Sequence, residues 1–140
     1  MTYTFAIVLA VFIAIALLGE YLRGRRLRRK YWSRPCAGVQ WRRAFPDAPK
    51  AEIRAFLQAF VDDFGLRPKE RLKFRPSDRP VDVYRTIYTG MEFDDGLEWE
   101  SFLRTMEKEY GVRIPGDPEW FERVTLGELF AMTRATPRER

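Results

Sequence analysis

The longest apolar stretch of the chain is its first 19 residues. They contain no charged residue, and ten of them are Leu, Ile, Val or Phe. As an α-helix rising about 1.5 Å per residue, the stretch would span about 28 Å, close to the roughly 30 Å hydrocarbon core of a bilayer. Each of the ten residues favours insertion at the helix centre by roughly 0.3–0.6 kcal/mol. The pattern therefore predicts a single transmembrane anchor over residues 1–22, in contact with the bilayer from Phe5 to Leu18.

A cleaved signal peptide is the alternative interpretation of this stretch. Such a peptide has basic residues before its apolar run and a small-x-small cleavage site after it. Here no Lys or Arg precedes Phe5, and the run is followed by Gly19-Glu-Tyr-Leu-Arg. The positive charges follow the span instead, and a positively charged flank stays in the cytoplasm. We therefore expect a single-pass protein of the bacterial inner (plasma) membrane, with its N-terminus outside and its C-terminal domain in the cytoplasm.

Two later segments carry apolar residues at the three-or-four spacing of an amphipathic helix. The first runs from about Asp47 to Gly65, and its apolar stripe consists of Ile53, Phe56, Leu57, Phe60, Val61 and Phe64. The second runs from about Trp99 to Tyr110, and its stripe consists of Trp99, Phe102, Leu103, Met106 and Tyr110. Each segment is followed by a glycine, which suits the left-handed position after a helix end. Both stripes predict helix faces that pack in a core.

The C-terminal part also shows helix signals. Residues 118–124 predict a short helical turn with Trp120 and Phe121 on its apolar side. Thr125-Leu-Gly-Glu128 is a capping box, which opens a last helix that runs to about Arg134. Residues 135–140 predict a disordered tail.

The pattern between these helices is less regular. The segment from Arg67 to Pro80 is basic and rich in proline, which predicts a solvated loop, with a partner-binding strip as the alternative. Residues 81–89 fit either a short helix capped by Ser77 or Asp78 or an extended segment, and we favour the helix.

Charge is distributed unevenly along the chain. There are 25 Lys and Arg and 20 Asp and Glu, and residues 1–36 hold seven of the former and one of the latter, which leaves 18 and 19 for the rest. We interpret residues 23–46 as a basic juxtamembrane linker that is attracted to anionic lipid headgroups by about 1 kcal/mol per basic residue. The residues expected to contact lipid are Arg23, Arg25, Arg26, Arg28, Arg29 and Lys30. Binding of nucleic acid is less favoured, because a domain of that class spreads positive charge over a folded face.

Aromatic residues accompany this segment. Tyr31 and Trp32 are suited to the headgroup level, and Trp41 is a further candidate near them.

Residues for catalysis or metal binding are scarce. The chain has no His and one cysteine, Cys36, which removes the commonest general base and excludes a zinc site made of several thiolates. The run Asp94-Asp-Gly-x-Glu lacks the ligand spacing of a calcium loop, and there is no glycine-rich phosphate loop. The carboxylates of Asp95 and Glu98 could in principle do acid–base work, although the sequence indicates no cleft. We expect no enzymatic activity, no cofactor and no metal.

From about Lys50 to Met132 the motifs follow one another in an order that resembles the acyl carrier protein family. Three stretches carry the resemblance: Asp95-Gly-Leu-Glu98, Met106-Glu-Lys-Glu-Tyr-Gly-Val-Arg-Ile-Pro115 and Val124-Thr-Leu-Gly-Glu-Leu129. The family writes them as Asp-Ser-Leu-Asp, Leu-Glu-x-x-Phe-Gly-x-x-Ile-Pro and Ile-Thr-Thr-Val-Gly-Asp-Leu. The resemblance implies an all-α fold, in which the N-terminal transmembrane helix is followed by a small acyl-carrier-like helical bundle over residues 47–134.

In this family a serine carries the phosphopantetheine arm. The family's spacing, counted back from Tyr110, places Gly96 at that position, and glycine has no hydroxyl to modify. The resemblance thus implies a carrier-like fold without the carrier chemistry. The alternative is a genuine acyl or peptidyl carrier that uses Ser101, five residues further along the chain.

Acidic residues cluster where the second amphipathic helix is expected to begin. Carrier proteins dock basic patches of partner enzymes through this surface, so the resemblance implies a partner-binding site at Asp94, Asp95, Glu98 and Glu100. Alternatively, the acids only complement the dipole at the helix start. We interpret the chain as a membrane-tethered, non-enzymatic module that docks a protein partner through this acidic helix. A lipid-binding anchor that acts through its polybasic segment remains a further alternative.

Overall fold

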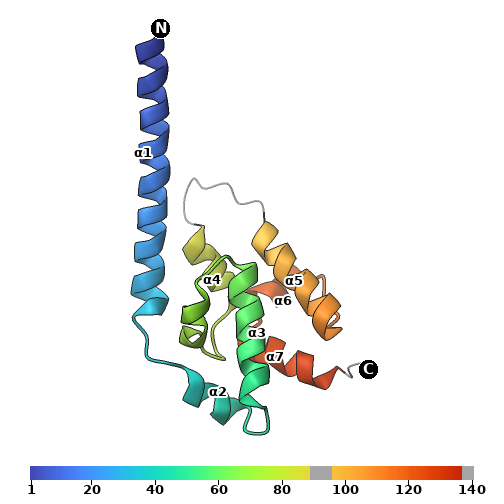
Figure 1. Cartoon of the computed structure of the whole chain (residues 1–140). Coiled ribbons are helices and arrows are strands. Elements are labelled where there is room, and N and C mark those ends of the chain that lie inside the picture. The colour runs from blue at the N-terminus through green and yellow to red at the C-terminus, as the bar shows by residue number, and fades with distance from the viewer. Residues whose placement is uncertain (89–95, 137–140) are drawn as a thin grey trace.

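The computed structural model describes residues 1–88 and 96–136, except for the side chain of Leu97. Every regular element in these residues is helical, which confirms the all-α fold class. Figure 1 shows a long N-terminal helix that stands out from a group of shorter helices. In chain order the elements are α1 (Thr2–Leu27), the π-helical η1 (Arg28–Trp32), α2 (Gly38–Ala44), α3 (Lys50–Asp63), the 3-10 helix η2 (Pro68–Lys73), α4 (Pro80–Ile87), α5 (Leu97–Tyr110), α6 (Pro118–Arg123) and α7 (Leu126–Ala135).

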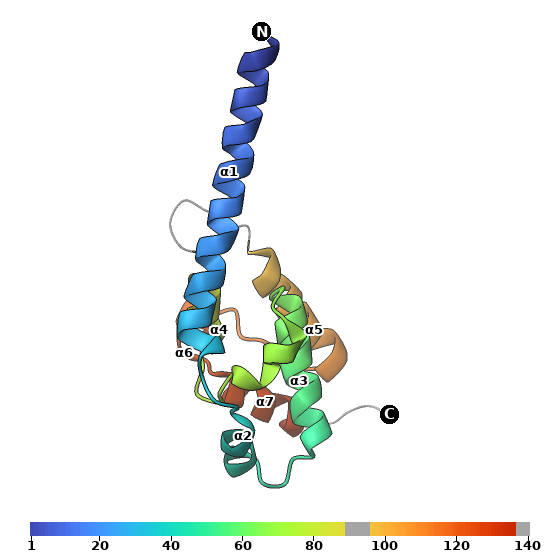
Figure 2. The same ribbon diagram turned by 60° about the vertical axis from the view of Figure 1, so that its left-hand side comes forward.

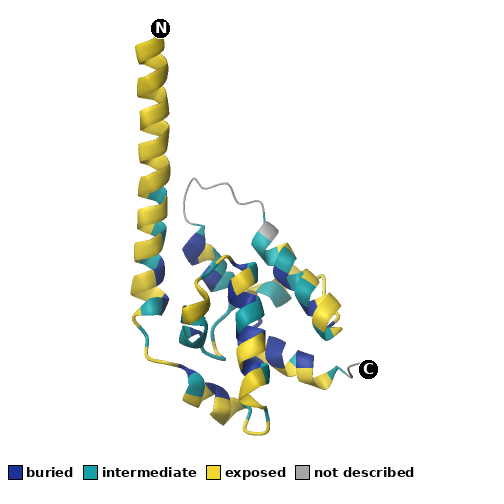
Figure 3. Ribbon diagram, in the orientation of Figure 1, coloured by how far each residue is buried: buried dark blue, intermediate teal, exposed yellow. Residues whose placement is uncertain are grey.

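Helix α1 continues directly into η1, and together they form one rod from Thr2 to Trp32. Figures 1 and 2 show its long α1 part. The apolar residues of its first five turns are exposed on all sides, as Figure 3 shows; Phe5 is 73% and Phe12 is 71% exposed. In the part of the chain that the structure describes, this is the one helix long and apolar enough to cross a membrane. Such a surface is unfavourable in water and suits the hydrocarbon of a bilayer.

The other end of the rod belongs to the core of the domain. Leu27 is 7% and Tyr31 is 1% exposed, and the Tyr31 ring lies 5.3 Å from the ring of Phe74. The Arg26 side chain donates to the backbone carbonyl oxygens of Thr86 at 3.2 Å and Ile87 at 3.3 Å, at the end of α4. The apolar stretch is therefore joined to the domain by a helix that packs against it.

The structure differs here from the expected juxtamembrane linker. Residues 38–44 form α2, and Trp41 on this helix is completely buried, with its indole N–H donating to the Phe74 carbonyl at 2.8 Å. The expectation that Tyr31 and Trp41 lie at the headgroup level is wrong, because both rings fill the core instead. The sequence pattern did not indicate this, because α2 is too short to show a helical period and Pro35 and Pro46 flank it.

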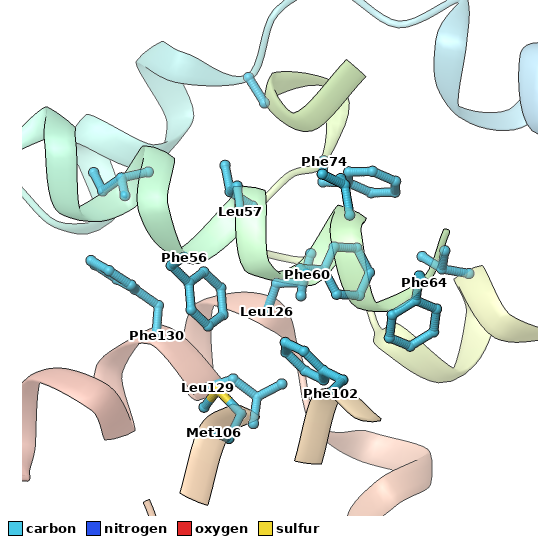
Figure 4. Close-up of a cluster of buried hydrophobic side chains, with 14 of the residues drawn as sticks. Phe56, Leu57, Phe60, Phe64, Phe74, Phe102, Met106, Leu126, Leu129 and Phe130 are labelled. Carbon is cyan, nitrogen blue, oxygen red and sulfur yellow. The ribbon is translucent and has the colours of Figure 1, made fainter. Parts of the chain in front are cut away.

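Helix α3 runs through the middle of the core, as Figure 4 shows. All six residues of its predicted stripe are buried, which confirms that prediction. Phe102 and Met106 of α5 pack on the same core and are completely buried. Edge-to-face ring contacts connect the helices, for example Phe60 with Phe102 at 5.3 Å between ring centroids. Residues from α7 complete the cluster: Leu126, Leu129 and Phe130.

Several helix ends agree with the sequence signals. Gly111 ends α5 in the left-handed conformation (φ 64°), and the Val112 N–H donates to the Met106 carbonyl at 3.1 Å. The capping box of α7 is confirmed, since the Thr125 hydroxyl oxygen accepts from the Glu128 N–H at 3.1 Å and the Glu128 carboxylate accepts from the Thr125 N–H at 2.8 Å.

The segment from Arg67 to Pro80 is more ordered than a solvated loop. It contains η2, and its Phe74 is completely buried. The favoured helix over residues 81–89 is present as α4, although neither Ser77 nor Asp78 caps it. Of the expected tail, residue 135 ends α7, and residues 137–140 lie outside the described residues.

Candidate functional site

Gly96 stands directly before α5 and has a left-handed backbone conformation, with φ 69°. Glycine reaches this region without strain, whereas a side chain there costs roughly 1–2 kcal/mol. There is thus a local backbone reason for glycine at the position that the resemblance aligns with the carrier serine.

Of the four acidic residues predicted to form a docking site, the structure describes two, Glu98 and Glu100. Asp94 and Asp95 lie outside the described residues. Glu98 is half-buried: one carboxylate oxygen accepts a hydrogen bond from the Tyr88 hydroxyl, and the other is buried without a hydrogen-bond partner among residues 1–88 and 96–136. Glu100 is exposed. Of the two described acids, therefore, Glu98 turns toward α4 and Glu100 toward solvent.

Ser101 lies in the second turn of α5 and is half-buried. Its hydroxyl donates to a carboxylate oxygen of Asp63 at 2.7 Å, at the end of α3. This bond joins α5 to α3, so the hydroxyl proposed for the alternative carrier role is engaged inside the bundle.

A groove of about 380 Å³ opens between α4, α5 and α6. Rings from all three helices line it, with centroids 4.9 Å apart for Tyr84 and Tyr88 and 5.5 Å apart for Trp99 and Phe121. Among the described residues, the one cation of the lining is Arg85, which pairs with Glu122 at 2.6 Å. The described lining is therefore mainly aromatic, and Val81 and Gly96 complete it.

The groove brings together residues that the sequence pattern did not connect. Tyr84 and Tyr88 belong to a segment whose period was ambiguous, and Phe121 lies more than thirty residues further along the chain. The Phe64 ring lies behind them, 6.5 Å from the Tyr84 ring and 6.0 Å from the Trp99 ring. One signal for such a cluster was present in the sequence: the chain has more aromatic residues than the two predicted helix stripes contain.

The basic residues expected to contact lipid also divide between different surroundings. Arg23 pairs with Glu20 at 2.8 Å, and Arg25 lies 6.0 Å from the centroid of the Tyr21 ring. The side chains of Arg26 and Lys30 turn to α4, where Lys30 donates to the Thr86 hydroxyl at 3.3 Å.

Two further residues of this set, Arg28 and Arg29, are exposed. The polybasic segment is thus part of a helix packed on the domain, and only some of its basic side chains are directed away from the domain.

Metal binding finds no support in the described part of the chain. Within residues 1–88 and 96–136, no group of three or more His, Cys, Asp or Glu side chains is placed to hold a metal ion.

Comparisons with known proteins assign no family to this geometry. No protein-family model, curated protein or solved structure matches the chain. The resemblance to acyl carrier proteins therefore stays a prediction.

Proposed function

We propose that this chain is a membrane-anchored, non-enzymatic module that holds a helical domain at the cytoplasmic surface of a bacterial inner membrane and docks a partner protein there. One observation carries the proposal: the helix that exposes an apolar surface at Phe5 and Phe12 is buried in the domain core at Leu27 and Tyr31. A flexible linker would leave the domain free to tumble. A helix that packs on the domain holds it at a constant height above the bilayer.

The charges support this orientation. Basic residues on the flank of a span remain on the cytoplasmic side, and the exposed residues of the rod beyond the apolar stretch include Arg25, Arg28 and Arg29. The N-terminus would then lie outside the cytoplasm and the helical domain inside it.

For the docking site we propose the aromatic groove between α4, α5 and α6. Its occupant is a basic, amphipathic segment from the cytoplasmic flank of another membrane protein. The end of α4 and the start of α5 lie on the side of the domain that faces the free end of α1 in Figure 1, and Figure 2 shows the same for the start of α5. Cytoplasmic flanks of transmembrane helices are rich in Lys and Arg, and they occupy the same level as this end of the domain.

The chemistry of the groove suits such a segment. Apolar residues of the partner would cover the rings of Tyr84, Trp99 and Phe121, which removes apolar surface from water. Basic residues of the partner would lie near the exposed carboxylate of Glu100 and the half-buried carboxylate of Glu98. Arg85 repels the basic residues of the partner less than an unpaired arginine would, because it already forms an ion pair with Glu122.

Membrane anchoring is tested by fractionating bacterial cells that produce the full chain. The protein is expected in the membrane pellet after washing with high salt and with alkaline carbonate, since neither extracts a spanning helix. A matched variant, Leu9→Arg with Ile13→Arg, is expected in the soluble fraction, because an arginine near the centre of a span costs roughly 2.5–3.5 kcal/mol. Extraction of the unaltered chain by salt or carbonate would remove the proposed anchor.

Docking is tested with the full chain in a neutral detergent and a fluorescent 14-residue helical peptide of Leu and Lys. Binding of this peptide, and not of a Leu and Glu peptide of the same pattern, is expected. Phe121→Ser and Glu100→Lys should each weaken binding about fivefold, or about 1 kcal/mol. The control is Glu109→Lys, which alters an exposed acid at the other end of α5. Equal binding of both peptides, or an equal effect of Glu109→Lys, would contradict the site.

A further inference from the structure

A second cleft lies between the end of the rod and α4. It has a volume of about 410 Å³ and is lined by Arg26, Arg29, Lys30, Asp82, Arg85 and Thr86. Four of these six residues are cationic, and Arg85 lies 55 or more positions from the other three along the chain. The packing of α4 against the rod, and not the polybasic sequence alone, therefore creates this concentration of positive charge.

The acidic residue in this lining, Asp82, forms an ion pair with a residue that does not line the cleft. Both carboxylate oxygens of Asp82 accept from the guanidinium of Arg79, at 2.9 and 3.0 Å. Hydrogen bonding to Asp82 raises the pKa of Arg79 above its ordinary value, so this guanidinium stays charged. Among the described residues, the lining therefore holds no carboxylate without an ion-pair partner.

The cations differ in how far they are engaged within the protein. The Arg29 side chain is exposed and forms no ion pair within residues 1–88 and 96–136. Lys30 is held over the cleft by its bond to the Thr86 hydroxyl, which in turn donates to the Asp82 carbonyl at 2.7 Å. One guanidinium nitrogen of Arg85 donates to the Glu122 carboxylate, and a guanidinium has five N–H donors in all. Arg29, Lys30 and Arg85 thus retain donors for a ligand.

The position of the cleft along the rod corresponds to the headgroup layer. Leu22 is the last large apolar residue of the exposed stretch, and Arg26 and Arg29 follow it by about 6 and 10 Å at 1.5 Å per residue. The headgroup layer on each side of a bilayer is roughly 5–8 Å thick, and arginine side chains reach back toward it along their apolar stems. A bilayer placed around the apolar stretch would therefore bring headgroup phosphates to the mouth of the cleft.

We propose that this cleft binds the phosphate of an anionic phospholipid from the cytoplasmic leaflet, in a site formed jointly by the rod and α4. The inference rests on the proposed function, since it requires the rod to lie in a bilayer. A phosphodiester oxygen pair matches the fork of an arginine, and the ammonium of Lys30 adds a point charge. A zwitterionic headgroup is disfavoured, because its own cation would be placed among the four cations of the lining.

The test separates this site from general attraction to a charged surface. The full chain in neutral detergent is titrated with phosphatidylglycerol or phosphatidylcholine, and the lipid retained is counted by native mass spectrometry. One phosphatidylglycerol is expected to be retained, and Arg29→Gln or Arg85→Gln should each weaken its binding about fivefold. The control Arg28→Gln, at an exposed position of the rod outside the cleft, should change binding less than twofold.

Another variant separates lipid binding from stability. Glu122→Gln breaks the same ion pair as Arg85→Gln but leaves the guanidinium in place, so it should bind phosphatidylglycerol at least as tightly as the unaltered chain. A loss in Glu122→Gln equal to that in Arg85→Gln would assign the effect to the ion pair and overturn the site.

Other results would also count against the proposed lipid site. Equal losses in Arg28→Gln and Arg29→Gln, with none in Arg85→Gln, would mean a charged helix surface without a cleft site. Displacement of the lipid by millimolar inorganic phosphate would mean a site for a soluble anion. A chain that stays in the membrane pellet but prefers neither lipid would overturn only this inference, whereas a chain absent from the pellet would remove the proposed function.

Discussion

The guanidinium of Arg34 donates to the carboxylate of Asp78 at 2.7 Å and so joins the segment after the rod to the loop before α4. The two side chains are only 19% and 11% exposed. The same carboxylate oxygen accepts from the Arg75 N–H at 2.7 Å, and the Asp78 carbonyl accepts from the Leu126 N–H at 2.8 Å. One residue thus connects the end of the rod, the loop and the start of α7.

Removing this connection should weaken the domain. Asp78→Ala is expected to lower the free energy of unfolding by about 2 kcal/mol, because it leaves a largely buried guanidinium and a backbone N–H without their acceptor. The control is Glu52→Ala, which breaks the more exposed pair with Arg134 and should cost less than about 0.5 kcal/mol. Urea unfolding of the full chain in mild detergent, followed by near-ultraviolet circular dichroism, measures both. Equal effects would show that Asp78 does not have this role.

The burial of Trp41 indicates that α2 is part of the domain core and not of a linker. Trp41→Ala should cost about 3–5 kcal/mol, because it empties a fully buried site and removes the hydrogen bond to the Phe74 carbonyl. Val39→Ala, on the same helix but 60% exposed, should change stability by less than about 0.5 kcal/mol. A Trp41 variant as stable as the unaltered chain would mean that α2 is not part of the core.

The backbone at Gly96 leads to a prediction about placing a serine at this position. Gly96→Ser should destabilise the domain by about 1 kcal/mol, because serine is strained at φ 69°. Gly116→Ser is the control, since a side chain at Gly116 meets nothing within 4 Å and needs no left-handed backbone. If thermal unfolding midpoints of the two variants were lowered equally, the strain at Gly96 would be disproved.

Truncation tests how the rod contributes to the fold. A chain that begins at Glu20 keeps Leu27, Tyr31 and Ala37 in the core and should unfold cooperatively in water without detergent. A chain that begins at Gly38 lacks these three buried residues and should be less stable by several kcal/mol, at roughly 1.5–3 kcal/mol per large apolar side chain. Equal urea midpoints for the two chains would contradict the packing of the rod on the domain.

The predictable part of the fold is the part with a local signal. The stripes of α3 and α5 follow the 3.6-residue period, and the capping box at Thr125 is contained within four residues, so both are visible without knowledge of the fold. Tyr31 and Trp41 enter the core through contacts with Phe74, more than thirty residues away. An isolated aromatic residue next to a predicted span fits a headgroup anchor equally well, and only the fold decides between the two.

The candidate sites were less predictable for the same reason. The inward orientation of Glu98 depends on Tyr88, which directly follows a helix whose existence was ambiguous from the sequence. The basic cleft depends on Arg85, which is distant along the chain from the polybasic segment. Charge patterns indicated that bases gather next to the span and acids at the start of α5. Which of these side chains remain available to a ligand follows from how α4 packs on the rod and on α5.

The central claim is that the rod crosses the membrane and enters a cytoplasmic domain, and Cys36 tests it directly. This residue is the only cysteine of the chain and is exposed just after the rod. A membrane-impermeant maleimide should label Cys36 in inverted membrane vesicles and not in intact spheroplasts. A Thr2→Cys, Cys36→Ser variant should show the opposite pattern. Labelling of Cys36 from outside intact spheroplasts would contradict the account.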